Sequence, residues 1–237
     1  MSHLTGEARS NYVRRMFGRI AGRYDLLNRL MTMGQDLRWR REAVERLRLT
    51  DDGPVLDIGA GTGDLAFEIL RQFPGAHAVA ADFTPEMIVV GRLRKKAGSV
   101  NWVVADALHL PFADSSFAGV ISGFLLRNLA DVEGSLSEQH RVLREAGRLV
   151  SLDTTPPPPG LFRPLIRFHL HTVIPTLGRM LAGEAEAYRY LPDSTEHFTT
   201  AEALAARMTA VGLAAVGYVR RMFGTIAIHW GSKAGTD

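Results

Sequence analysis

The chain has 237 residues, 46% of them hydrophobic and 22% charged, and a formal net charge of +3. This length allows one large α/β domain, alone or with an appended lobe, and the composition is typical of a soluble globular protein. There is no cysteine, which excludes disulfides, thiolate metal sites and a thiol nucleophile. Residues 1–10 are polar and no apolar run reaches about 18 residues. We therefore expect neither a signal peptide nor a transmembrane helix, and predict a cytoplasmic protein.

Basic residues gather near the N-terminus. Ten arginines and only four acidic residues lie between positions 14 and 48, which gives this segment a net charge of +6. A solvated helical face explains this pattern as well as a surface that meets anionic lipid head groups at the inner face of the cell membrane. Nucleic acid is not an expected partner, because no recognised binding motif accompanies the charge.

The helical spacing of apolar side chains predicts helices over residues 11–49. The side chains that repeat at three- and four-residue steps are Val13, Phe17, Ile20, Tyr24, Leu27, Trp39, Ala43 and Leu47. Gly34 is expected to separate two helical segments, and the turn at 51–53 to end the second. Residues 1–50 are therefore predicted to form an N-terminal helical lid.

Short apolar runs then alternate with helical stretches. The predicted strands are residues 54–58, 77–82, 100–106, 117–124 and 147–153, and the helices between them are residues 64–73, 85–97 and 132–144. This alternation with short connections requires parallel pairing and right-handed crossovers. Residues 51–155 are therefore predicted to form a doubly wound, Rossmann-like α/β core with helices on both faces of the sheet.

Four consecutive prolines at 156–159 end this alternation, because proline continues neither a strand nor a helix. Residues 156–195 are predicted to form a helical insertion that covers the substrate. The apolar residues at 161–181 fit either a segment that meets a membrane surface or a lid packed on the core. His169 and His171 lie there without a third ligand, so no metal site is expected.

Residues 196–237 are predicted to complete the core. Residues 201–211 have a helical pattern, and residues 214–220 and 225–230 read as a closing pair of strands. These two strands bring the expected total to seven.

The central motif is the glycine-rich segment at 57–64, directly after the first predicted strand. Its spacing is Gly59-x-Gly61-x-Gly63, where a dinucleotide site would have Gly-x-Gly-x-x-Gly. Asp64 at the start of the next helix would oppose a phosphate bound there. A cationic amino acid group suits Asp57 and Asp64 better, which favours S-adenosylmethionine as the ligand, although Asp57 could also act only as a helix cap.

Two further predicted strands also end in an acid. Asp82 can accept hydrogen bonds from a ribose diol, and Asp106 is placed for the edge of an adenine. Phe83 and Met87 could pack on the adenine ring, although each is equally plausible as a core residue. Acids at the ends of three successive strands are a more specific signal for an adenosyl ligand than any one of them.

The sequence resembles the ubiquinone/menaquinone biosynthesis C-methyltransferase family from about residue 13 to residue 233. The segments that carry the resemblance are 17–28, 38–41, 57–64, 82–87, 126–131, 175–178, 188–194 and 227–231. The most restrictive are Arg23-Tyr24-Asp25-x-x-Asn28 and Leu126-Arg127-Asn128. The chain departs from the family pattern at Leu125, at 153–154 and at 222–225.

The resemblance implies a seven-stranded class I methyltransferase fold and methyl transfer from S-adenosylmethionine to a ring carbon of a polyprenylated quinol, such as demethylmenaquinol. By the same resemblance, Thr62, Asp82, Asp106 and Ala107 contact the cofactor. The contact on the fourth strand falls at Ser122 or Gly123, and we assign it to Gly123. A homodimer is a further expectation.

A quinol carbon becomes nucleophilic only when a neighbouring hydroxyl loses its proton. Arg127 at the end of the fourth strand is predicted to face the crevice and stabilise the phenolate, with Asn128 holding the geometry. Tyr24 or Asp25 from the lid would orient the quinol or relay its proton. Structural roles for Arg127 and Tyr24, as an ion-pair partner and a packing aromatic, are the competing interpretation.

Three other functions remain open from the sequence. The cofactor motifs fit an O- or N-methyltransferase of another small molecule equally well. A nicotinamide-dependent dehydrogenase is disfavoured by the glycine spacing and by Asp64. A catalytically silent partner in a quinone-synthesis assembly gains no support from the intact motifs.

Overall fold

The computed structural model describes residues 6–95, 97–157, 172, 194–196 and 198–235. The strands are β1 (Pro54–Ile58), β2 (His77–Asp82), β3 (Val100–Val104), β4 (Phe117–Gly123), β5 (Leu143–Thr154), β6 (Leu213–Arg221) and β7 (Ile226–Lys233). The α-helices are α1 (Gly6–Ile20), α2 (Tyr24–Met31), α3 (Gln35–Glu45), α4 (Asp64–Gln72), α5 (Pro85–Arg92), α6 (Val132–Val142) and α10 (Ala201–Ala210). Short 3₁₀ turns are η1 (Ala21–Arg23), η2 (Ala97–Ser99), η3 (Leu126–Asn128) and η5 (Met222–Gly224).

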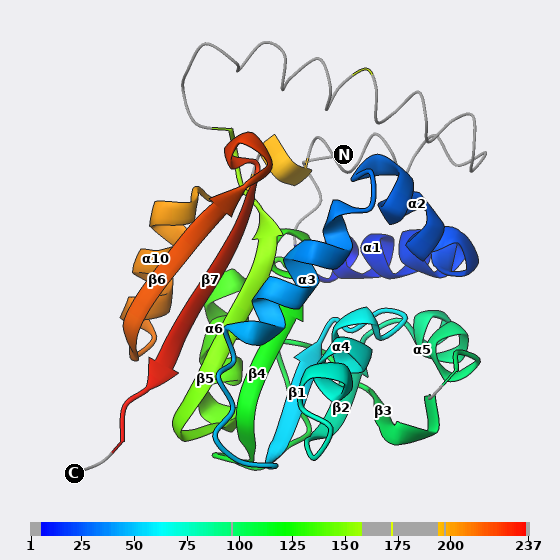
Figure 1. The fold of residues 1–237 in the computed structure, drawn as a ribbon. Helices are drawn as coiled ribbons and strands as arrows, with labels where there is room; N and C mark the ends of the chain where they lie inside the picture. Colours follow the sequence, from blue (N-terminus) through cyan, green and yellow to red (C-terminus); the bar gives the residue numbers. More distant parts are fainter. Residues whose placement is uncertain (1–5, 96, 158–171, 173–193, 197, 236–237) are drawn as a thin grey trace.

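The strands form a single sheet in the order β3-β2-β1-β4-β5-β7-β6. The pairs from β3 to β5 are all parallel, and β7 runs antiparallel to both of its neighbours. Figure 1 shows the twisted sheet with helices on both of its faces. The predicted doubly wound, mostly parallel seven-stranded α/β fold is confirmed.

Each face of the sheet buries its own set of apolar side chains. On one face α3 and α4 pack through Val44 and Ile69 against strand residues such as Ile121. On the other face α6 and α10 pack through Leu136 and Leu204 against the alternate strand residues. Strands buried on both faces explain the continuous apolar runs that predicted them.

The strand order reverses between β1 and β4, which lie side by side although β2 and β3 separate them in the chain. Open α/β sheets bind ligands at the carboxyl ends of the strands at such a reversal. Above this edge, α1 and α2 form a small apolar cluster of their own through Met16, Ile20 and Leu27. Gly34, with φ +74°, is the N-cap of α3 and separates it from α2, as predicted, but the 3₁₀ turn η1 also divides the first predicted segment into α1 and α2.

The predicted boundaries differ from the observed ones by one or two residues at several elements and by more at α5, β5 and β7, which ends at Lys233. The fifth helix ends at Arg92, where residues up to 97 were expected to be helical, and β3 stops at Val104 because Asp106 turns back in a bridge to His109. β5 begins at Leu143, so α6 is shorter than predicted. The register between β4 and β5 shifts near Phe117 to accommodate this early start.

Several predictions lie outside the described residues. They are the helical insertion at 161–191, its membrane-facing segment at 161–181, His169, His171, and the family segments at 175–178 and 188–193. The domain boundaries at 50, 155 and 195 remain predictions.

Gly63 precedes α4 and occupies a position that no other residue fits well. Its φ is +88°, and a Cβ there would lie 2.5 Å from Cη2 of Trp102. Both the left-handed backbone and the contact with a large ring disfavour a side chain.

We predict that Gly63→Ala destabilises the protein by about 2–4 kcal/mol, which lowers the Tm by roughly 5–15 °C for a chain of this size. Differential scanning fluorimetry measures the shift. Gly98→Ala is the control, because a Cβ at Gly98 meets no atom within 4 Å. Equal melting temperatures for the two variants would contradict this account of Gly63.

Candidate active site

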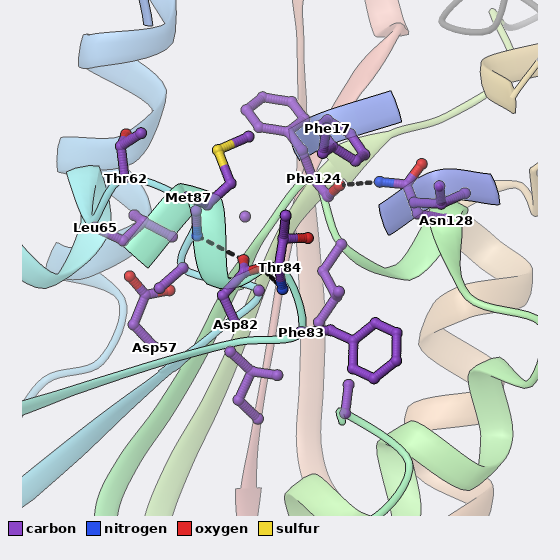
Figure 2. A pocket seen from close by; sticks show the side chains of 18 of the residues that line it. Phe17, Asp57, Thr62, Leu65, Asp82, Phe83, Thr84, Met87, Phe124 and Asn128 are labelled. Atoms are coloured by element: carbon purple, nitrogen blue, oxygen red, sulfur yellow. Dashed lines mark hydrogen bonds between the residues drawn. The ribbon is translucent and has the colours of Figure 1, made fainter. Parts of the chain in front are cut away.

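A cavity opens at the carboxyl ends of β1, β2 and β4, where the strand order reverses, and residues of α1 and α2 reach over it. Eleven of the predicted site residues line this cavity: Tyr24, Asp57, Gly59, Gly61, Thr62, Asp82, Phe83, Asp106, Ala107, Gly123 and Asn128. Asp25, Gly63 and Arg127 do not line it. Figure 2 shows Asp57 and Asp82 on one side of the cavity and Asn128 on the other.

The glycine-rich turn forms the floor of the cavity. Gly59 and Gly61 have φ values of +64° and +56°. A Cβ at Gly61 would meet only Cε1 of Tyr24, at 4.0 Å, so it would project into the cavity. The backbone therefore comes close to any bound molecule at Gly61, which a residue with a side chain would prevent.

Asp57 is a buried carboxylate with one free oxygen. Its Oδ2 accepts a hydrogen bond from the backbone amide of Ala66 (3.0 Å), whereas its Oδ1 has no partner among the described residues. Burial raises the pKa of Asp57 well above its usual value, and the amide of Ala66 and the charge of Arg40 offset this only in part. Asp57 thus caps α4, as the competing interpretation held, and also offers an oxygen to a cationic ligand.

Asp82 is held in place by the loops around it. Its carboxylate accepts hydrogen bonds from the backbone amides of Gly61 and Thr84, both at 2.7 Å. Burial raises the pKa of Asp82, because these two bonds do not fully compensate for lost hydration. Asp106 is more exposed and accepts a bond from the amide of Leu108 at 2.9 Å.

Asp64 is surrounded by arginines. Arg94 Nη1 and Arg29 Nη2 lie 2.8 and 2.9 Å from its carboxylate oxygens, and Arg40 Nε lies 3.5 Å away. Burial would raise the pKa of Asp64, but attraction to Arg40 and Arg29 outweighs it and lowers the pKa. Asp36 joins this group through Arg29 and through Arg40 Nη1 at 2.7 Å. The charge of Asp64 is therefore already compensated, which leaves Asp57 as the better partner for a ligand cation.

The lid is joined to the glycine-rich turn through Asp25. Thr62 Oγ1 donates a 2.7 Å hydrogen bond to Asp25 Oδ1, and Arg94 Nη1 lies 3.4 Å from the other oxygen. Arg94 also donates to the backbone oxygen of Thr62 at 3.0 Å. Asp25 is thus engaged with the turn and not with the cavity.

Tyr24 and Asn128 are the predicted catalytic residues that do face the cavity. Asn128 Nδ2 donates a 2.8 Å hydrogen bond to the backbone oxygen of Phe124, and this bond is drawn in Figure 2. Asn128 Oδ1 is buried without a partner among the described residues. The Tyr24 ring packs edge-on against Phe17, with centroids 5.7 Å apart. Asn128, with its unpaired Oδ1, and the phenol of Tyr24 therefore line the same cavity.

Arg127 lies behind the cavity wall, although the sequence analysis expected it to face the crevice. Its Nη1 lies 2.8 Å from Asp153 Oδ1, and its backbone amide donates to Asp153 Oδ2 at 3.2 Å. Both side chains are buried, with relative exposures of 5% and 2%. The cause is the neighbouring strand, since Asp153 near the end of β5 lies beside η3 and supplies the nearest anion.

Three cations near the site were not predicted as site residues from the sequence. Arg14 lines the cavity with its guanidinium 5.4 Å from the centre of the Phe83 ring, and Arg40 also lines it. Arg94 follows α5 and reaches Asp64 from there. Arg40 is four residues after Asp36 on α3, a spacing that could have revealed their pairing. Nothing local distinguishes Arg14 or Arg94 from other surface arginines.

The site offers carboxylates without a full complement of cations, backbone exposed at a glycine turn, and no phosphate-binding arrangement at the start of α4. These features fit the cationic amino acid end and the ribose of S-adenosylmethionine. The fold and the site together define a class I S-adenosylmethionine-dependent methyltransferase.

Comparison with known proteins agrees with this class. The model of the ubiE/COQ5 methyltransferase family matches residues 5–233, so the chain belongs to this family. A ubiquinone/menaquinone biosynthesis C-methyltransferase of Desulfotalea psychrophila is 46% identical over 93% of this chain and 90% of that protein. A demethylmenaquinone methyltransferase of Thermus thermophilus is 46% identical over 92% of this chain and 100% of that protein.

Solved structures confirm the fold at low sequence identity. A SAM-dependent methyltransferase of Thermotoga maritima superimposes with a TM-score of 0.62 and 19% identity, over 92% of this chain and 98% of that one. Membership in a methyltransferase family decides against the nicotinamide-dependent dehydrogenase.

The raised pKa of Asp57 generates a prediction that separates stability from binding. A carboxyl whose pKa is raised by folding adds most stability at low pH, and this contribution is lost as pH rises through the folded-state value. At neutral pH the buried charge is therefore unfavourable, and Asp57→Asn should raise the Tm of the ligand-free protein.

The same substitution should weaken binding of S-adenosylhomocysteine at least about tenfold, because a hydrogen bond to a charged group contributes about 1.5–3 kcal/mol. Calorimetry gives the affinity and a thermal scan gives the Tm. The difference in Tm should shrink as the pH falls, since Asp57 is then protonated and neutral like Asn. A variant that is less stable than the wild type at neutral pH would refute the assigned cost of this charge.

Proposed function

We propose that the protein transfers the methyl group of S-adenosylmethionine to a ring carbon of a polyprenylated quinol, with demethylmenaquinol as the leading candidate. Relatives that are 46% identical over nearly their full length carry the names of C-methyltransferases of this pathway. The observation that carries the proposal is the apolar wall of the cavity, which lines the same space as the acids. Its residues are Val13, Phe17, Tyr24, Phe124, Leu125 and Leu129.

This apolar wall suits a flat, uncharged ring better than an amine or a sugar. Aromatic side chains stack on such rings, and the adjacent polar groups then fix their orientation. The second candidate, an O- or N-methyltransferase of another small molecule, would share the cofactor site but would not require a residue that activates a ring carbon.

The cofactor supplies an activated methyl group on a positively charged sulfur. Within the protein, Asp57 Oδ1 would accept from the ammonium of its amino acid end. Asp82 would accept from the ribose hydroxyls, and Asp106 with Ala107 would meet the adenine edge. Phe83 lies beside Asp82 and lines the same part of the cavity.

Asn128 and Tyr24 are proposed to hold the quinol. The unpaired Oδ1 of Asn128 accepts from a quinol hydroxyl, which withdraws that proton from the oxygen and raises electron density on the neighbouring ring carbon. Tyr24 packs on or bonds to the ring from the lid side. Alignment of this kind can supply roughly 7–11 kcal/mol of barrier reduction.

Arg127 and Asp25 are proposed to act through other residues. The Arg127–Asp153 pair fixes η3, and so the direction of Asn128. Asp25 fixes Thr62 in the glycine-rich turn. Both are positioning residues in this scheme.

Peripheral contact with a membrane surface and a homodimeric state are further proposals. Within the described part of the chain, no helix has the length and apolar character needed to span a bilayer. A prenylated substrate would reside in the membrane, so the enzyme must reach the membrane surface to bind it.

The reaction itself is tested with methyl-labelled S-adenosylmethionine and each reduced precursor, a demethylated naphthoquinol or benzoquinol. Mass spectrometry and NMR should show one added methyl group on a ring carbon and the loss of one ring hydrogen. Asp82→Asn is the negative control. A methyl ether as the product, or no transfer to either quinol, would overturn the proposal in favour of the second candidate.

We predict that Arg127→Ala and Asp153→Asn each lower kcat more than tenfold while the affinity for S-adenosylhomocysteine changes less than about threefold, since both break the pair that orients Asn128. Stopped turnover assays at saturating quinol measure this. Breaking a buried pair also costs about 3–5 kcal/mol of stability, so folding is checked by circular dichroism at a low temperature.

Arg127→Lys is the matched variant, because it keeps a positive charge that can pair with Asp153 but loses the planar guanidinium that places Nη1 at its Oδ1. It should recover part of the kcat. Turnover within about tenfold of the wild type in folded Arg127→Ala would exclude any role for this pair in the reaction.

A further inference from the structure

The outer side of α2 and α3 has an unusual set of exposed residues. Between positions 22 and 41 the exposed residues are Gly22, Arg23, Leu26, Leu30, Met33, Gln35, Leu37, Arg38 and Arg41. Four of these are large and apolar, three are arginines, and none is acidic. We call this surface the α2–α3 face.

The apolar members form one stripe. Leu26 and Leu30 lie one turn apart on α2, Met33 lies in the turn that follows, and Leu37 lies on α3, so the stripe runs along α2 and across the turn to α3. Their relative exposures are 61%, 42%, 73% and 49%. Side chains of this kind are usually buried or scattered singly, and a contiguous exposed stripe marks an interaction surface.

The acids of the same segment point inward. Asp25 accepts from Thr62, and Asp36 accepts from Arg40 inside the protein. The exposed residues between positions 22 and 41 therefore carry a net charge of +3, from Arg23, Arg38 and Arg41, and the next exposed acid along α3 is Glu45. A surface that combines apolar side chains with positive charge complements the anionic head groups and acyl chains of a bilayer.

The ion pairs beneath the face hold it in a fixed shape. Arg29 on α2 reaches both Asp36 on α3 and Asp64 on α4. The two helices are thereby fixed to each other and to the core. The stripe is thus organised before it meets a partner, which lowers the entropy cost of docking.

The face and the cavity share one helix. Tyr24, at the first turn of α2, lines the cavity, whereas Leu26 and Leu30 lie exposed on the same helix. Figure 1 shows α2 at the outer edge of the molecule, beside α1.

We infer that the α2–α3 face docks on the surface of an anionic phospholipid bilayer and places the cavity next to it. The reason for such docking rests on the proposed function: the long apolar tail of a prenylated quinol could stay in the bilayer while its ring enters the cavity. The binding surface itself is defined by charge and apolar exposure alone.

Vesicle sedimentation tests the inference with phosphatidylcholine vesicles, with and without phosphatidylglycerol. The wild type should bind the anionic vesicles and lose binding at high salt. Leu26→Gln/Leu30→Gln and Arg38→Gln/Arg41→Gln should each reduce partitioning at least about tenfold, and glutamine preserves helix propensity. Leu93→Gln is the matched control, since Leu93 is 83% exposed and lies after α5, outside residues 22–41 that define the face.

Unchanged binding by both double variants, or an equal loss with Leu93→Gln, would overturn the inference. Light scattering covers the alternative of a second copy of this chain. A wild-type dimer that the Leu26/Leu30 variant converts to monomer, without vesicle binding, would assign the face to self-association instead. A drop in Tm of that variant without any change in vesicle binding would show that the stripe is covered by the chain itself.

Methyl transfer to a short-tailed quinol in detergent separates this inference from the proposed function. The double variants should keep wild-type turnover there, and lose it only with long-tailed quinol in vesicles. If no quinol is methylated but vesicle binding follows the predicted pattern, the docking surface stands and the proposed substrate fails.

Discussion

The ion pairs around Asp64 are the constraint on which the site depends. Arg29 from the lid, Arg40 from α3 and Arg94 from the end of α5 all reach this one carboxylate, at the first residue of α4. Because α3 also packs on the sheet through residues such as Val44, these ion pairs matter most for α2, which they join to α3, to α4 and to the end of α5. With them α2, the glycine-rich turn and the start of α4 are held in one arrangement. The negative charge of Asp64 is therefore paired with arginines that join these elements.

Asp57 and Asp82 differ from Asp64, because no arginine pairs directly with them among the described residues. Both are taken out of water, and burial raises the pKa of each. Such carboxylates are unfavourable in the empty protein and become favourable when a ligand brings a positive charge and hydrogen-bond donors. Stability is thus given up at the proposed S-adenosylmethionine site, a pattern expected of functional sites.

Much of this could be predicted from the sequence, because local signals are strong where strands are buried on both faces. β1 and β2 end where expected, and Asp57, Asp82 and Asp106 reach the cavity because parallel strands present their carboxyl ends at one edge. Arg127 was misplaced because its partner is Asp153, on a strand that only tertiary pairing brings alongside. Pairings of this kind leave no trace in sequence spacing.

One physical claim is therefore central. Asp57 and Asp82, to which no arginine bonds directly among the described residues, bind the cationic cofactor beneath N-terminal helices that arginine ion pairs hold in place. A crystal structure with S-adenosylhomocysteine tests it most directly. The ammonium should lie within hydrogen-bond distance of Asp57 Oδ1, the ribose hydroxyls on Asp82 and the adenine beside Asp106. A ligand bound elsewhere, or bound here with its carboxylate and not its ammonium against Asp57, would contradict the claim.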